Sequence, residues 1–143
     1  MPFCVKDDVD IAGMDSTLGC SVHLYKPKSG TAVIVQALQS LGAVPFCKTN
    51  VPQGIIAAPC ENPIYGRTLN PLNKRLGPGV SSGGTGCLVA ARGSPFGIGT
   101  DLGGSVRIPA HFCGVTGLAP TVGRNSSRGI TECYKGIAGC NYY

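Results

Sequence analysis

Glycine is concentrated in one part of this 143-residue sequence, and that concentration limits what the chain can fold into. The range from Gly77 to Gly123 holds 13 of the 22 glycines. A residue without a Cβ adopts backbone conformations that others resist, and it lets two stretches of backbone pack closely. Apolar residues make up 43% of the sequence and the mean hydropathy is +0.17, so there is apolar surface to bury. We therefore expect a folded chain rich in tight turns.

The length is that of one ordinary domain, and we treat residues 1–143 as a single unit. Charged residues make up only 13% of the sequence, against a usual share of about 25%, as if the chain were the interior of something larger. No apolar run approaches the roughly 18 residues of a membrane-spanning helix. Residues 1–8 lack the apolar region of a secretory signal, so we expect an intracellular protein.

The net charge of +5 does not indicate a nucleic-acid partner. The 12 lysines and arginines are scattered from Lys6 to Lys135, only Lys74 and Arg75 are adjacent, and tryptophan is absent. Nucleic-acid binders carry a dense basic face, usually with stacking aromatics. We expect no nucleic-acid partner.

The eight cysteines predict neither a disulfide framework nor a metal centre. The closest two, Cys133 and Cys140, are seven positions apart, no C-x-x-C occurs, and there are only two histidines. Without a secretory signal, we expect reduced thiols that are mostly buried and act as small apolar side chains.

The hydrophobic pattern before the glycine-rich part indicates an α/β fold. Residues 31–41 put Ile34, Ala37, Leu38 and Leu41 on one helical face, and an apolar run at 43–47 predicts a buried strand. A helix followed closely by a buried strand is typical of an α/β layer. Further along we expect an irregular connection at 52–80, a helix at 83–92, an extended piece at 97–100, a tight turn at 103–105 and a buried strand at 115–118.

Two serine clusters lie among the glycines, at 79–84 and 101–105. Glycines beside a serine let backbone N–H groups converge on one point, as an oxyanion hole requires. Two ordinary glycine–serine turns explain the same pattern. The match of 79–83 to the G-x-S-x-G elbow lacks the preceding strand, and the absence of a Gly-Lys pair excludes a Walker A loop.

A hydrolase with so few histidines needs another base, and Lys6 is the candidate. Burial in the apolar start of the chain favours the neutral amine, whereas Asp7 and Asp8 favour the charged lysine. A solvated surface lysine is the ordinary alternative. The sequence leaves these alternatives open.

Longer stretches resemble the amidase signature family of serine hydrolases, most closely its fatty acid amide hydrolase branch. The stretch SSGGTGCLVAARGSPFGIGTDLGGSVRIPAHFCGVTGLAPT, at 81–121, carries most of the resemblance. Four shorter segments, at 2–7, 13–19, 42–46 and 49–53, extend it toward the start. The resemblance implies a mixed β-sheet flanked by α-helices, of which this chain would be an incomplete part, truncated at both ends.

The resemblance also implies a Ser–Ser–Lys triad. Ser105 would be the nucleophile, Ser81 the bridging serine after a cis peptide bond, and Lys6 the base. The backbone N–H groups of residues 102–105 would hold the oxyanion, that is, those of Leu102, Gly103, Gly104 and Ser105. Supporting positions would be Ser82, Thr100, Asp101 and Arg107. No metal and no organic cofactor is implied.

Three residues depart from the family pattern. Val80 stands where glycine is usual, and a β-branched residue directly before Ser81 is expected to displace it. Ala119 replaces a usual lysine, a loss to which we assign no role, and Cys4 replaces a usual serine, a mild change. The family domain is also several times longer, so we expect a fragment or an incomplete gene model.

The sequence thus predicts an enzyme that hydrolyses amides, with fatty acid amides as the leading substrates. One alternative is a small-amide amidase of the same family. Another is a non-catalytic fragment with an interaction or regulatory role. Membrane association and a homodimer are left open for the complete protein.

Overall fold

A parallel three-stranded sheet organises the computed structural model, which describes residues 1–132. Its central strand is β1, Pro2–Lys6, flanked by β2, Val44–Thr49, and by the short β5, Gly97–Ile98. In the β1–β2 register Val5 lies opposite Lys48, and Lys6 lies opposite Thr49. Because the strands run in parallel, their carboxyl ends meet at one edge of the sheet.

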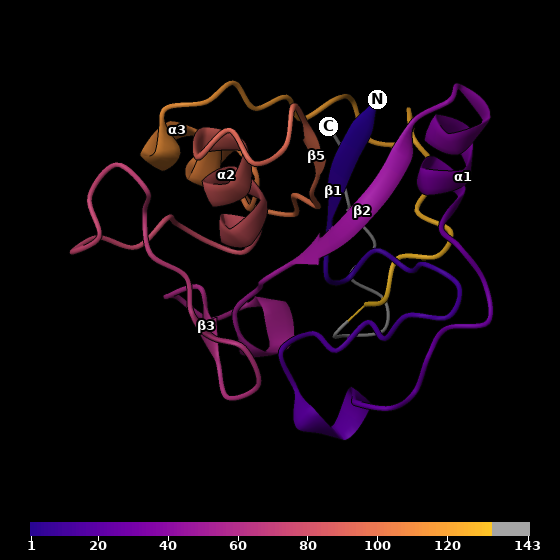
Figure 1. Ribbon diagram of the computed structural model, residues 1–143, viewed down its shortest axis with the longest axis horizontal. Coiled ribbons are helices and arrows are strands. Elements are labelled where there is room, and N and C mark those ends of the chain that lie inside the picture. Colours follow the sequence, from indigo (N-terminus) through magenta and orange to yellow (C-terminus); the bar gives the residue numbers. More distant parts are fainter. Residues whose placement is uncertain (133–143) are drawn as a thin grey trace.

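Within residues 1–132, three short α-helices accompany the sheet: α1 (Val33–Ser40), α2 (Gly83–Ala90) and α3 (Arg107–Cys113). Figure 1 shows α1 on one side of the strands and α2 with α3 on the other. The remaining elements are the 3₁₀ turns η1 (Ser21–His23) and η2 (Gln53–Ile55) and an antiparallel pair, β3 (Glu61–Asn62) with β4 (Gly66–Arg67). None of the helices described is long and apolar enough to cross a bilayer.

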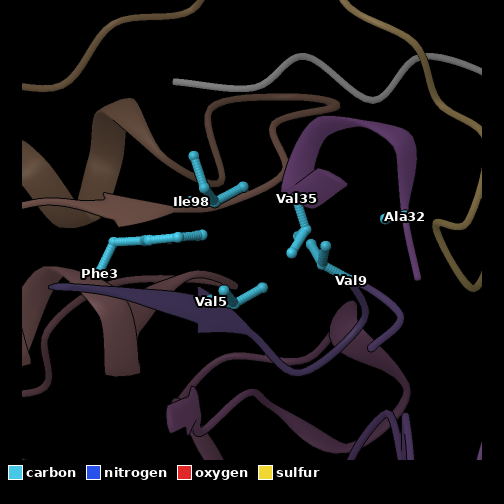
Figure 2. Packing of buried hydrophobic residues seen from close by; sticks show 6 residues of the cluster. All are labelled: Phe3, Val5, Val9, Ala32, Val35 and Ile98. Atoms are coloured by element: carbon cyan, nitrogen blue, oxygen red, sulfur yellow. The ribbon is translucent and has the colours of Figure 1, made fainter. Parts of the chain in front are cut away.

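The core lies between the sheet and α1. It consists of six buried side chains, which Figure 2 shows together: Phe3, Val5, Val9, Ala32, Val35 and Ile98. Phe3 also stacks on Phe96, with ring centroids 5.2 Å apart. Successive side chains of a strand point to opposite faces. Since Phe3 and Val5 occupy the core face, Lys6 is directed to the opposite face, toward α2.

The α/β expectation and most predicted elements are confirmed. The helix predicted at 31–41 forms as α1, and the strand predicted at 43–47 forms as β2. The predicted burial of that strand is wrong, because Val44 is 59% and Phe46 is 49% exposed. The predicted apolar face of α1 was partly wrong, because Val35 is the buried residue whereas Leu41 is 83% exposed. Leu41 lies just past the last helical residue, beyond the reach of the core.

The chain after residue 51 agrees with its prediction in four places and differs in two. Helix α2, strand β5 and the turn at 103–105 form as expected, and 52–80 is largely irregular. The buried strand expected at 115–118 is wrong: no strand forms there and Leu118 is 64% exposed. Helix α3 was not predicted, because Pro109 discourages a helix. Pro109 is tolerated because it sits in the first turn, where its missing N–H has no intrahelical partner to lose.

The six cysteines within residues 1–132 are free thiols. Four are buried, as expected, whereas Cys20 and Cys47 are half-buried. Burial raises the pKa of the Cys87 thiol to about 12 and that of Cys4 to about 11, which disfavours the reactive thiolate. Cys133 and Cys140 lie outside the described residues.

Glycine is required where α2 meets the end of β2. A Cβ on Gly84 would lie 2.5 Å from both the backbone nitrogen and the backbone oxygen of Asn50. The Gly84 N–H donates to that same Asn50 carbonyl at 3.2 Å. Backbone is therefore packed on backbone here, and the approach sets how α2 sits on the sheet.

We expect Gly84→Ala to destabilise the fold by about 2 kcal/mol, because the added methyl group must displace the Asn50 backbone. Gly30→Ala is the control, since its Cβ would meet nothing within 4 Å. Denaturant unfolding of both variants measures the effect. Equal stabilities would contradict the close-packing argument.

Candidate active site

Lys6 ends β1 inside the protein, with only 1% of its surface exposed. Its Nζ donates to Ser81 Oγ at 2.7 Å and to Thr100 Oγ1 at 2.5 Å. The Thr100 carbonyl oxygen lies 3.4 Å from the same nitrogen. A buried amine surrounded by hydroxyl groups is the setting that a lysine base needs.

The carboxylate of Asp8 faces the same amine. Asp8 Oδ2 lies 3.5 Å from Lys6 Nζ and accepts a hydrogen bond from Thr100 Oγ1 at 2.6 Å. Asp8 is fully buried. Asp7 and Asp8 both follow Lys6 in the sequence, and their order alone does not predict which carboxylate approaches the amine. The alternation of strand residues does not extend past the end of β1, so no periodic signal existed there.

Ser81 and Ser82 lie at the start of α2. The peptide bond between Val80 and Ser81 is cis, as the resemblance implied. Ser81 is 3% exposed, and its hydroxyl contacts Lys6 even with Val80 in place of glycine. The displacement expected from Val80 therefore does not prevent this contact.

Ser82 ties three segments together. Its hydroxyl donates to the Thr100 carbonyl at 3.2 Å, and its N–H donates to the Ser105 carbonyl at 3.0 Å. A Cβ on Gly99 would lie 2.7 Å from the Ser82 hydroxyl oxygen, so glycine is needed for this approach. Ser82 thus holds the two serine clusters beside each other.

Ser105 is half-buried, on the turn before α3. Its carbonyl is held by Ser82, but within residues 1–132 its hydroxyl makes no hydrogen bond to Ser81 Oγ. Of the predicted triad, the structure joins Lys6 to Ser81 and brings Ser105 close through its backbone.

The backbone N–H groups of the loop at 102–105 differ in whether they already donate to an acceptor. The Gly104 N–H donates to Asp101 Oδ1 at 2.5 Å. The N–H groups of Leu102, Gly103 and Ser105 donate to no acceptor in the described part of the chain. Gly104 has φ +112°, and a Cβ there would meet the Ile108 side chain at 2.8 Å, so the loop requires glycine.

Asp101 holds this loop against the start of α3. Its buried carboxylate takes two hydrogen bonds of 2.9 Å from the Arg107 guanidinium, and it accepts from the N–H groups of Val106 and Arg107. Burial alone would raise the pKa of Asp101. The hydrogen bonds from Arg107 and the backbone outweigh burial and hold that pKa well below its usual range.

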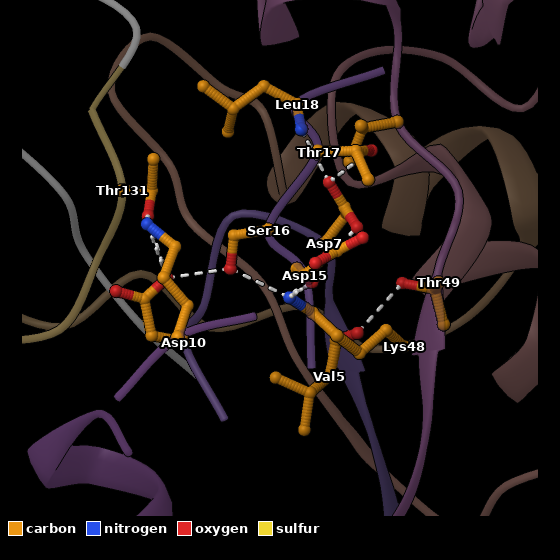
Figure 3. A network of polar contacts seen from close by, with 12 residues as sticks. Val5, Asp7, Asp10, Asp15, Ser16, Thr17, Leu18, Lys48, Thr49 and Thr131 are labelled. Carbon is orange, nitrogen blue, oxygen red and sulfur yellow. Dashed lines mark hydrogen bonds and ion pairs between the residues drawn. The ribbon is translucent and has the colours of Figure 1, made fainter. Parts of the chain in front are cut away.

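A second polar network lies at the same end of β1 and β2 (Figure 3). Lys48 Nζ donates to the Asp15 carbonyl at 2.7 Å and to Ser16 Oγ at 2.8 Å, and it lies 4.0 Å from Asp7 Oδ1. Asp7 Oδ2 accepts from Thr17 and from the Leu18 N–H. Burial lowers the pKa of Lys48 and raises that of Asp7, and each group opposes the shift of the other.

An apolar pocket of about 400 Å³ lies next to Ser82, between α2, β5 and α3. Ser82 contributes to its lining, whereas Lys6, Ser81 and Ser105 do not. The pocket is therefore adjacent to the polar cluster but does not contain the reactive groups.

The whole-chain comparison agrees with this geometry. The family model described as Amidase matches residues 1–139. The chain belongs to the amidase family.

Two relatives show how much of their length this chain spans. The chain is 48% identical to fatty-acid amide hydrolase 1 of Sus scrofa, over 91% of the chain and 22% of the relative. It is 47% identical to the vitamin D3 hydroxylase-associated protein of Gallus gallus, over 96% of the chain and 30% of the relative. The chain thus spans less than a third of the length of either relative.

A solved structure confirms the amidase fold. A glutamyl-tRNA(Gln) amidotransferase subunit from Thermotoga maritima superposes with a TM-score of 0.86 at 32% identity, over 91% of this chain and 29% of that one. The three strands and their helices are therefore one part of the larger amidase architecture.

Asp101→Asn is expected to cost about 2 kcal/mol of stability at neutral pH, because it breaks charge-assisted hydrogen bonds. The folded pKa of Asp101 is depressed. Its contribution is therefore fully present above the unfolded value of about 3.9 and is lost as the pH falls toward the folded value. Denaturant unfolding between neutral pH and about pH 3 should show the gap to wild type shrinking on acidification.

Glu61→Gln is the control for this measurement. Its pair with Arg67 is 3.9 Å long and half-exposed, so its loss should leave stability almost unchanged. A gap for Asp101→Asn that stays constant with pH would contradict the proposed ion pair.

Proposed function

We propose that Lys6, Ser81 and Ser105 form the catalytic triad of a serine hydrolase that cleaves amide bonds. The observation that carries this proposal is the 2.7 Å hydrogen bond between the buried Lys6 amine and the Ser81 hydroxyl. These groups are 75 residues apart in sequence, and both are more than nine-tenths buried. Such a contact between a lysine and a serine matches the nucleophile-and-base logic of Ser–Lys hydrolases.

The reaction begins with two linked proton transfers. Neutral Lys6 Nζ accepts the proton of Ser81 Oγ, while Ser81 Oγ accepts the proton of Ser105 Oγ. Ser105 Oγ forms a bond to the amide carbonyl carbon, and the carbonyl electron pair moves onto its oxygen. This step requires the Ser105 hydroxyl to come within hydrogen-bond reach of Ser81 Oγ.

The intermediate then collapses to an acyl-enzyme. The oxyanion electron pair re-forms the carbonyl, the C–N bond breaks, and the proton returns from Lys6 through Ser81 to the leaving amine. Water attacks the acyl-enzyme by the same route, which releases the acid and restores Ser105. Atoms and charge balance with no further reactant.

The loop before α3 supplies the oxyanion hole in this proposal. Its donors are the N–H groups of Leu102, Gly103, Gly104 and Ser105, with Gly104 leaving Asp101 when the oxyanion forms. Ser82 and Thr100 hold the serine clusters together, and the Asp101–Arg107 pair fixes the loop. The N–H groups of Leu102, Gly103 and Ser105, which have no acceptor within residues 1–132, can stabilise developing charge without reorganisation, whereas Gly104 must first break its hydrogen bond to Asp101.

We propose fatty acid amides as the substrates, and we propose that residues 1–143 form part of a larger amidase domain. The 48% identity to a fatty-acid amide hydrolase supports the substrate class. The coverage of only 22% of that relative supports the partial domain. A lipid chain needs a long apolar channel, which the pocket behind Ser82 does not supply for Ser105.

A fluorophosphonate probe is expected to label the native gene product at Ser105. Ser105→Ala should abolish labelling, and Lys6→Ala or Ser81→Ala should slow it by at least about 100-fold, because proton transfer is lost. Ser94→Ala is the control: Ser94 is also buried, but its hydroxyl bonds to the Phe96 carbonyl. Mass spectrometry locates the label, and labelling that survives Ser105→Ala would refute the nucleophile.

A small-amide amidase is the second candidate, favoured by the 42% identity to a relative from Emericella nidulans named acetamidase, over 87% of this chain and 23% of that relative. Competition between oleamide and propionamide separates the two candidates. We expect oleamide to be hydrolysed with the higher kcat/KM, because each buried methylene adds about 0.8 kcal/mol of binding. A preference for propionamide would favour the small-amide candidate.

A non-catalytic role is the third candidate, since the chain spans less than a third of its relatives. Immunoblotting with peptide mass mapping measures the native size. A product much larger than 14.6 kDa, with peptides outside this sequence, would support the catalytic proposal. A product of 14.6 kDa that no fluorophosphonate labels would favour the non-catalytic role.

A further inference from the structure

Three buried aspartates surround the site, and one differs from the others in its hydrogen bonding. Asp101 uses both carboxylate oxygens, and Asp7 directs one oxygen to Thr17 and Leu18 and the other to Lys48. Asp8 directs only Oδ2 to partners. Its Oδ1 is buried and accepts no hydrogen bond within residues 1–132.

An unpartnered carboxylate oxygen makes Asp8 a costly residue for stability alone. Leaving a buried acceptor unsatisfied costs about 1–3 kcal/mol, and more for a charged group. A residue kept only for the fold would be expected to use both oxygens, as Asp7 and Asp101 do. The contacts that Asp8 does make converge on Lys6 and on Thr100, which itself bonds to Lys6.

We propose that Asp8 is a positioning residue that controls the charge on Lys6 during amide hydrolysis. This inference rests on the proposed function of Lys6 as the base. Asp8 acts in two ways, directly across 3.5 Å and through the Thr100 hydroxyl, which bridges the two side chains. Thr100 fixes the amine in line with Ser81, and the carboxylate sets how readily that amine holds a proton.

The effect of Asp8 on the reaction has opposite signs in its two stages. Before attack, its negative charge favours the ammonium form of Lys6, so the triad needs a higher pH to present a neutral amine. During attack, Lys6 gains a proton from Ser81, and the same carboxylate stabilises the ammonium that forms. Asp8 therefore lowers the activity at low pH, where it keeps Lys6 charged, and speeds the attack of Ser105 once Lys6 is neutral.

Other groups that face this pair are few in the described part of the chain. Ser81 and Thr100 bond to Lys6, and the Cys60 thiol is near enough for Lys6 to lower its pKa, although burial dominates and raises it. Asp7 and Lys48 approach from the second network, and both interact electrostatically with Asp8. Their opposite charges partly cancel at the site, which leaves Asp8 as the nearest charge to Lys6.

The test is the pH profile of Ser105 labelling by a fluorophosphonate in the native gene product and in Asp8→Asn. Asparagine keeps an acceptor for Thr100 and removes the charge. We expect the acidic limb of the Asp8→Asn profile to move to lower pH by about one unit, with a lower plateau rate. Asp7→Asn is the matched control, since it removes the neighbouring buried carboxylate, which faces Lys48. The proposal would be overturned if the acidic limb of the Asp8→Asn profile stayed where it is in wild type, or if Asp7→Asn moved it equally.

A second measurement keeps the inference testable if Asp8→Asn does not fold. In wild type, the ¹³C resonances of Lys6 Cε and Asp8 Cγ should report each other's titration, because interacting groups titrate as a pair. An Asp8 Cγ chemical shift that does not change over the pH range where Lys6 titrates would refute the coupling. If wild type is coupled but Ser105 is never labelled, the proposed function fails while the Asp8–Lys6 interaction stands.

Discussion

The rest of the site depends on the polar contacts that the buried amine of Lys6 makes. Removing a lysine from water is costly unless polar partners surround it. Here the partners come from three separate segments: Ser81 before α2, Thr100 after β5, and Asp8 after β1. The requirement to satisfy one amine therefore also fixes where the two serine clusters lie. The core face of β1 makes this possible, because Phe3 and Val5 anchor the strand that carries Lys6.

Glycines provide the short distances that this arrangement needs. At Gly84 one backbone rests on another, at Gly99 the Ser82 hydroxyl fills the place of a side chain, and at Gly104 the chain turns through a positive φ beside Ile108. Each position serves a different contact, so the concentration of glycine in the sequence reflects several independent approaches. Together they bring Asp101, Ser82 and the loop at 102–105 to within hydrogen-bond reach of one another.

Local patterns in the sequence were enough to predict α1, β2, α2 and the turn at 103–105, because periodicity and glycine content act over a few residues. Local patterns also pointed to Lys6 and to the two serine clusters, but the assignment of Lys6, Ser81 and Ser105 to one triad came from the resemblance of longer stretches, and their catalytic roles stay predictions. Asp8 and α3 could not be predicted. Asp8 lies past the end of a strand, where no period fixes its direction, and α3 is stabilised by Asp101, which lies outside it. The wrong strand at 115–118 shows that an apolar run does not by itself secure burial.

The contacts of Lys6 also bear on how the chain must be synthesised and folded. They join residues that are 75 and 94 positions apart, so two long loops close before the amine has its partners. Loop closure of this kind is a non-local event and slows folding. A nascent chain that has emerged only as far as β2 holds the lysine with none of these hydroxyl groups beside it. The polar cluster around Lys6 therefore forms only once the later half of the chain is present, and no piece that ends before Thr100 can assemble it.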